Sequence, residues 1–100
     1  MTLKDKAEIY ALHYISKSKA ESKSINQGLK RNHSFKAFGL PIPKVIDGLK
    51  TRKLLELYSL NELNRHDREK KRYRITYNLE NPEHVSFFEK FQALYPGEVL

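Results

Sequence analysis

Apolar residues recur at three- and four-residue spacing near the start of the chain, which predicts a helix over residues 3–16. One face of this helix would carry Leu3, Ala7, Tyr10, Ala11 and Tyr14. Ile9, Leu12 and Ile15 widen that face, so the helix is expected to be well buried. Thr2 precedes the first turn and can cap it.

A polar segment rich in Ser and Lys, residues 16–24, is interpreted as the end of that helix and a turn. Ser24 can cap a short second helix that ends near Arg31. Residues 32–39 fit a loop or a further short turn, although the two phenylalanines in this segment require burial.

Two prolines then constrain the backbone before a third predicted helix. Because proline is favoured at the first helical position, this helix is expected to start near Pro43. Its apolar positions are Val45, Ile46 and Leu49. Gly48 costs about 1 kcal/mol relative to alanine if it is exposed, and its lack of a side chain would allow close packing or close backbone approach.

Two strand-like segments follow and predict a β-hairpin. Residues 54–60 are rich in Leu, and residues 72–77 alternate strictly between two faces. One face of the second strand would carry Tyr73, Ile75 and Tyr77. The polar residues 61–71 between the strands are expected to form a long charged loop.

A last helix is predicted from residue 82 onwards. Asn81-Pro82-Glu83 combines a capping residue, a first-position proline and a first-turn carboxylate. Apolar residues follow with helical spacing as far as Tyr95, and Pro96-Gly97 ends the helix. The predicted fold is α+β and mainly helical, in the order helix, helix, helix, strand, strand, helix.

The charge of the chain is strongly basic and unevenly distributed. The 100 residues include 19 Lys and Arg against 12 Asp and Glu, for a net charge of +7 at pH 7. The bases gather in residues 17–36, 44–53 and 61–74, whereas residues 80–100 are acidic apart from Lys90. Segregated charge favours a polyanionic partner, nucleic acid or an acidic membrane surface, over a charge excess that only keeps the chain in solution.

Composition disfavours several other classes of protein. No segment approaches the roughly 18–20 apolar residues of a membrane span, and the N-terminus lacks the apolar core of a secretory signal. A cytoplasmic location is therefore expected. The chain has no Cys, and its four His residues have no metal-like spacing. Nucleotide-binding, zinc-protease and hydrolase motifs are absent, so we expect no cofactor, no metal and no enzymatic activity.

Three segments together resemble the winged helix-turn-helix superfamily. Residues 38–49, FGLPIPKVIDGL, resemble its turn and recognition helix, and residues 46–57, IDGLKTRKLLEL, match its spacing into the first wing strand. Residues 71–76, KRYRIT, resemble its returning wing strand. The resemblance implies a winged helix-turn-helix domain over residues 1–80, with residues 81–100 as an additional helix packed on it or on a dimer partner.

The chain departs from the family pattern in two places. Lys53 stands where the family often has the glycine that ends the recognition helix. Either this turn is right-handed or Lys53 bears a strain of about 1 kcal/mol. The segment between the second and third helices is also several residues longer than the usual tight turn.

The resemblance implies a DNA-binding transcriptional regulator, typical of a virus, a plasmid or a prokaryote. Its third helix would enter the major groove of double-stranded DNA, and its wing would lie on the backbone or in the minor groove. The candidates for base contact are Lys44, Asp47, Gly48 and Thr51, and those for phosphate contact are Lys50 and Arg52. The wing candidates are Arg65, Arg68, Lys70, Lys71, Arg72 and Arg74. Asp47 could instead be a solvated helix acid, and Asp67 and Glu69 could pair with the wing bases.

Winged-helix domains also bind proteins, so the alternative function is a protein-interaction module, such as a small viral or mobile-element protein that binds a host factor. The aromatic stripe of the last helix can be covered by the domain itself or by a second copy, and a homodimer is favoured over a monomer. The candidate interface residues are Phe87, Phe88, Phe91 and Tyr95.

Overall fold

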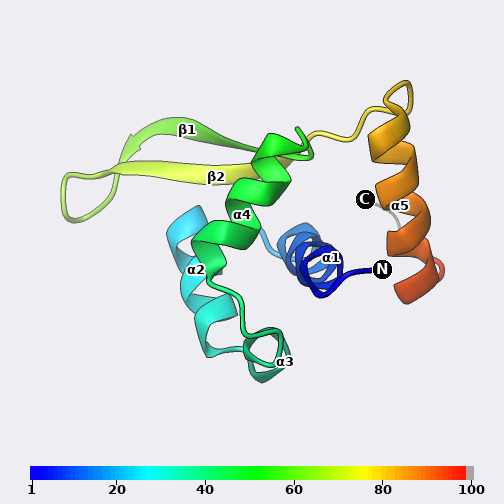
Figure 1. Cartoon of the computed structure of the whole chain (residues 1–100). Coiled ribbons are helices and arrows are strands. Elements are labelled where there is room, and N and C mark those ends of the chain that lie inside the picture. Colours follow the sequence, from blue (N-terminus) through cyan, green and yellow to red (C-terminus); the bar gives the residue numbers. More distant parts are fainter. Residues whose placement is uncertain (99–100) are drawn as a thin grey trace.

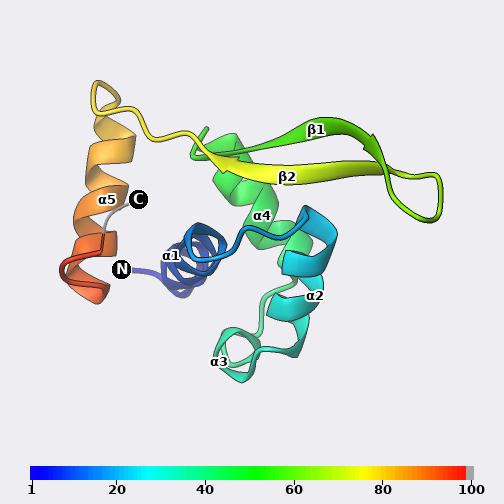
Figure 2. The ribbon, with the colours of Figure 1, turned by 180° about the vertical axis from the view of Figure 1, so that it is seen from behind.

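The computed structural model describes residues 1–98, which form five helices and one two-stranded antiparallel hairpin, an α+β fold. The elements are α1 (Leu3–Ser16), α2 (Ser22–Arg31), α3 (His33–Lys36), α4 (Ile42–Thr51), β1 (Leu55–Leu63), β2 (Glu69–Ile75) and α5 (Pro82–Leu94). Helix α1 lies in the middle, with α2, α3 and α4 on one side and α5 on the other (Figure 1). The hairpin projects away from α5, as the view from behind also shows (Figure 2).

Helix α1 is the centre of the core, and its predicted bounds and cap are confirmed. The backbone N–H of Asp5 donates to Thr2 Oγ1 at 3.1 Å, and the N–H of Thr2 donates to Asp5 Oδ2 at 3.3 Å. These two bonds satisfy backbone donors that the first turn leaves free. The buried face of α1 packs mainly against α4, and α1 also contacts α2, α3, α5 and β2. The largest fully buried apolar side chains are Ile9, Leu12, Leu29, Val45, Leu49, Leu54 and Phe91.

The connection between α2 and α4 contains the short helix α3. The prediction that Ser24 caps the second helix is wrong, because the helix already begins at Ser22. Asn32 Oδ1 accepts the N–H of Phe35 at 3.0 Å and the hydroxyl of Tyr10 at 2.9 Å, which fixes α3 on α1. The ring of Phe35 is buried, as its apolar character requires.

The hairpin is longer, and its turn shorter, than the sequence suggested. Leu55 pairs with Ile75 at the base of the hairpin, and Leu63 pairs with Glu69 near its end. The expected long loop over 61–71 is therefore wrong, since only residues 64–68 form the turn. The register shifts between Ser59 and Leu63, where β1 contains more residues than the paired part of β2 and the ladder is irregular.

The alternation predicted for the second strand is confirmed. Tyr73 and Ile75 are half-buried against the core, and the Tyr73 hydroxyl donates to Asn26 Oδ1 on α2 at 2.8 Å. Arg72 and Arg74 point the other way and are exposed. The base of the hairpin is thus fixed to α2, while its turn extends beyond the core.

Helix α5 begins as predicted, with Asn81 Oδ1 accepting the N–H of Glu83 at 2.9 Å. Phe87 and Phe91 are 3% and 0% exposed, so both already belong to the core of the chain itself. They are not available for the expected dimer interface, and Phe88 and Tyr95 are half-buried against the same core. Residues 99 and 100 of the expected C-terminal segment lie outside the described residues.

Lys53 ends α4 in the left-handed conformation, with φ of 60°. Its N–H donates to the carbonyl of Lys50 at 2.9 Å, and the N–H of Leu54 donates to the carbonyl of Leu49 at 3.0 Å. This pair of bonds closes the helix in the way that usually requires glycine. Of the two alternatives at position 53, the structure therefore has the strained one.

Replacing this lysine by glycine removes the strain. We expect Lys53→Gly to raise the free energy of unfolding by about 0.5–1 kcal/mol, because glycine adopts positive φ without a steric cost. Urea denaturation measures the change. The control is Lys50→Gly in the right-handed last turn of α4, which should lower the stability by about 1 kcal/mol. A loss of stability in both variants would contradict strain at Lys53.

Candidate nucleic-acid interface

Helix α4 has one buried face and one exposed face. Val45, Ile46 and Leu49 are buried, which orients the helix on α1 and the start of β1. The opposite face consists of the exposed residues Pro43, Lys44, Asp47, Lys50 and Thr51. The structure therefore brings four of the predicted contact residues of this helix together on one free surface.

Arg52 does not belong to that surface. Its guanidinium donates to Glu8 Oε2 at 2.8 Å, to Asp5 Oδ1 at 3.2 Å and to Glu83 Oε1 at 3.2 Å. The three carboxylates come from α1 and α5, so Arg52 ties the end of α4 to both helices. The expectation that Arg52 meets phosphate is corrected, because its side chain is already occupied inside the molecule.

Gly48 is explained by one of these carboxylates. Glu8 is fully buried, and its Oε1 has no hydrogen-bond partner among residues 1–98. A Cβ atom at position 48 would lie 2.4 Å from that oxygen. Gly48 thus provides room for the Glu8 carboxylate, which confirms close packing as a use of this glycine.

The pKa values of the two acids of α1 are shifted in opposite directions, although Arg52 lowers both. Burial raises the pKa of Glu8 above its ordinary value of 4.5, although the charge of Arg52 acts against this. Burial would also raise the pKa of Asp5, but the hydrogen bonds from Thr2 and the charges of Lys90 and Arg52 outweigh it and hold that pKa below 3.8. Ionised Glu8 is therefore the costly member of the cluster.

The packing of Glu8 on Gly48 can be tested with a double-mutant cycle. In the wild type, Gly48→Ala should lower the free energy of unfolding by about 1 kcal/mol, because overpacking outweighs the gain in helix propensity. In the Glu8→Ala background the same change should raise it by about 0.5–1 kcal/mol, since only the propensity gain remains. Urea denaturation of the four proteins gives both values. An equal effect in the two backgrounds would show that the side chains do not interact.

The raised pKa of Glu8 predicts a specific pH dependence. The folded chain holds the Glu8 proton to a higher pH than the unfolded chain does, so the wild type should lose stability relative to Glu8→Gln as the pH rises above 4.5 and through the raised pKa. Unfolding free energies of both proteins between about pH 4 and pH 8 test this. A difference that stays constant, or that changes in the opposite sense, would contradict a raised pKa.

The bases of the hairpin fall into two groups. Arg65, Arg68, Lys71 and Arg72 are exposed and have no ion-pair partner within the described part of the chain. Lys70 Nζ lies 3.7 Å from Glu62 Oε2, and Arg74 Nη1 lies 3.0 Å from Glu56 Oε1. The acids that pair with hairpin bases are thus Glu62 and Glu56, and not Asp67 and Glu69. The first group is free to bind an anion.

Helix α2 adds bases that the sequence did not assign to the site. A cavity of about 480 Å³ lies between α2 and the hairpin turn, and its lining includes Lys23, Arg65 and Lys70 together with one acid, Glu21. The sequence left Lys23 between two interpretations, a solvated helix end and a contact to DNA. The hydrophobic alternation of β2 was the one signal in the sequence that a helix would lie beside the hairpin, because the apolar face of the strand had to pack on a helix.

Charge is segregated in space as well as along the chain. Residues 22–77, which contain α2, α4 and the hairpin, carry 14 Lys and Arg against five Asp and Glu. Residues 78–98, which contain α5, carry one base against four acids. The hairpin turn and α5 lie at opposite ends of the molecule (Figure 1). One end is therefore strongly positive.

Residues 1–98 contain no cluster of three or more side chains that could hold a metal ion. No helix in that range is both long enough and apolar enough to cross a membrane. Comparison of the chain with protein families, curated proteins and solved structures finds no match. Only the geometry and charge of this chain itself therefore bear on its function.

Proposed function

We propose that the chain binds double-stranded DNA as a winged helix-turn-helix protein. The observation that carries the proposal is the collection of exposed, unpaired bases on α2, α4 and the hairpin, at the end of the molecule away from the acidic α5. Phosphate contacts supply most of the affinity of DNA-binding proteins, so a basic surface of this kind has the required charge.

The arrangement of the elements supports a winged helix. Helices α1, α2 and α4 pack on one another, and the hairpin follows α4 directly and contacts α2. Helix α4 would correspond to the recognition helix and the hairpin to the wing. The major groove is wide enough for an α-helix, and the exposed face of α4 offers side chains to it.

The side chains of this surface have different roles in the proposal. Lys44 is suited to donate to guanine, and Asp47 to accept from the amino group of cytosine. Arg65, Arg68, Lys71 and Arg72 would meet phosphates and set the affinity rather than the sequence preference. Arg74 contributes less, because its guanidinium already binds Glu56 and lies 4.4 Å from the centre of the Tyr58 ring.

The wing contribution predicts a change in salt dependence. The variant Arg65→Ala, Arg68→Ala, Lys71→Ala should bind duplex DNA at least about tenfold more weakly at moderate salt, and its log–log salt slope should fall by about 0.9 for each phosphate that the wing no longer neutralises. Fluorescence anisotropy with a labelled duplex at several salt concentrations measures both quantities.

The matched control is Lys6→Ala, Lys17→Ala, Lys90→Ala, which removes the same charge from α1 and α5. It should leave the affinity within about twofold of the wild type, because long-range effects of exposed charges are screened. Equal losses in both triple variants would mean that only net charge matters. No binding by the wild type at about 50 mM salt would overturn the proposal and favour a protein-interaction module.

A further inference from the structure

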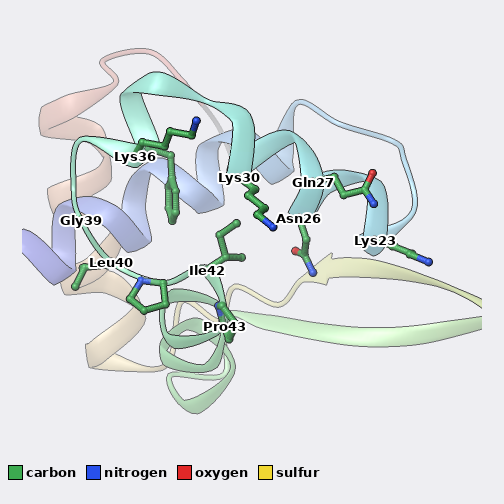
Figure 3. A pocket seen from close by; sticks show the side chains of 11 residues that line it. Lys23, Asn26, Gln27, Lys30, Lys36, Gly39, Leu40, Ile42 and Pro43 are labelled. Carbon is green, nitrogen blue, oxygen red and sulfur yellow. The ribbon is translucent and has the colours of Figure 1, made fainter.

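An open apolar groove lies between α2, α3 and the segment that joins α3 to α4, with a volume of about 690 Å³ (Figure 3). Its floor is formed by Phe35, Leu40, Pro41, Ile42 and Pro43. Phe35 belongs to the core, whereas Leu40 and Ile42 are only half-buried. The folded chain thus leaves neighbouring apolar side chains partly uncovered in this groove.

The rim of the groove carries positive charge and no acid. Lys23, Lys30 and Lys36 line it, and none of the three has an ion-pair partner in residues 1–98. Lys30 extends from α2 toward the middle of the groove (Figure 3). Asn26 Oδ1 is occupied by the Tyr73 hydroxyl, which leaves the amide nitrogen of Asn26 to donate. All the charged groups of the lining therefore attract an anion.

The extra chain length between α2 and α4 creates this groove. A tight turn would bring the two helices together, but residues 32–41 instead form α3 and a loop that supplies most of the floor. Gly39 adopts φ of 69° where the chain turns back, and the prolines fix the backbone on either side of Ile42. The groove is therefore formed before any ligand arrives, which lowers the entropic cost of binding.

We propose that the groove binds a small anionic amphiphile, namely a carboxylate attached to an alkyl or aromatic body. The carboxylate would lie at Lys30, which extends toward the middle of the groove, and the apolar body would cover Leu40, Ile42 and the prolines. The volume falls in the range of about 300–1,000 Å³ that is typical of small-molecule sites. A nucleic-acid backbone offers the charge but no apolar body, so the floor favours the amphiphile. This proposal stands independently of DNA binding.

Octanoate and 1-octanol are matched probes, because they share an apolar chain and differ in charge, and acetate supplies the charge alone. In titrations followed by ¹H–¹⁵N NMR, octanoate below its micelle-forming concentration should shift the amides of α2 and residues 35–44 and should saturate. Octanol and acetate should each bind at least about tenfold more weakly, since one lacks the ion pair and the other the apolar contact.

Two variants test the groove itself. Lys30→Glu with Lys36→Glu should weaken octanoate binding at least about tenfold. Leu40→Ser should also weaken it, because the floor of the groove loses an apolar contact with the alkyl chain. The control Lys6→Glu with Lys19→Glu makes the same charge change at exposed lysines outside the groove lining and should bind normally. The same spectra report whether each variant is folded.

Several results would overturn the proposal. Octanol binding as tightly as octanoate would show that the charge does not contribute, and acetate binding as tightly would show that the apolar chain does not. Chemical-shift changes spread over the whole surface would show non-specific binding. Displacement of octanoate by an acidic amphipathic peptide that binds more tightly would instead identify a protein partner. The Arg65, Arg68, Lys71 variant should retain octanoate binding, so failure of DNA binding and failure of this site are distinguishable.

Discussion

The position of Arg52 holds this small molecule together. A single guanidinium joins the end of α4 to carboxylates of α1 and α5, and His84 Nε2 lies 2.6 Å from the carbonyl oxygen of the same residue. Glu8 is the buried member of this cluster, so removing Arg52 is costly because it leaves the charge of Glu8 without compensation. The packing of Glu8 on Gly48 belongs to the same constraint, so α4 meets α1 at a charged contact as well as an apolar one.

That contact determines which part of α4 is free. Since Val45, Ile46 and Leu49 face the core and Arg52 faces the ion cluster, the remaining side chains of α4 form one exposed surface. The hairpin begins immediately after this fixed point, and the Tyr73–Asn26 bond fixes its base on α2. The bases of α4 and of the paired part of the hairpin are therefore held on elements fixed to the core, which limits the entropy lost when a polyanion binds, whereas Arg65 and Arg68 lie on the turn.

Much of the fold could be predicted from the sequence, because local patterns determine it. Helix α1 with its Thr2 cap, the start of α5 at Asn81 and the alternation of β2 follow from spacing and capping chemistry. The hairpin turn was missed because its strands continue through polar residues, where hydrophobic alternation gives no indication.

At the candidate site, Arg52 was misassigned because its partners are 31 to 47 residues away in the sequence. Glu8 within an apolar face was the available indication of a buried ion pair. The aromatic residues of α5 were assigned to a dimer interface because the sequence does not tell whether an apolar helix face is buried within the chain or by a second copy.

The irregular register of β1 has a consequence for how the molecule behaves among its own copies. The sheet has only two strands, so each has an edge whose backbone groups could pair with another chain. The shift in register between Ser59 and Leu63 interrupts the regular ladder on one edge. Lys71 and Arg72 place like charges along the other edge, so two hairpins that approach edge to edge repel one another. The same bases that we propose for contact with phosphate thus also protect a long, isolated hairpin from aggregation.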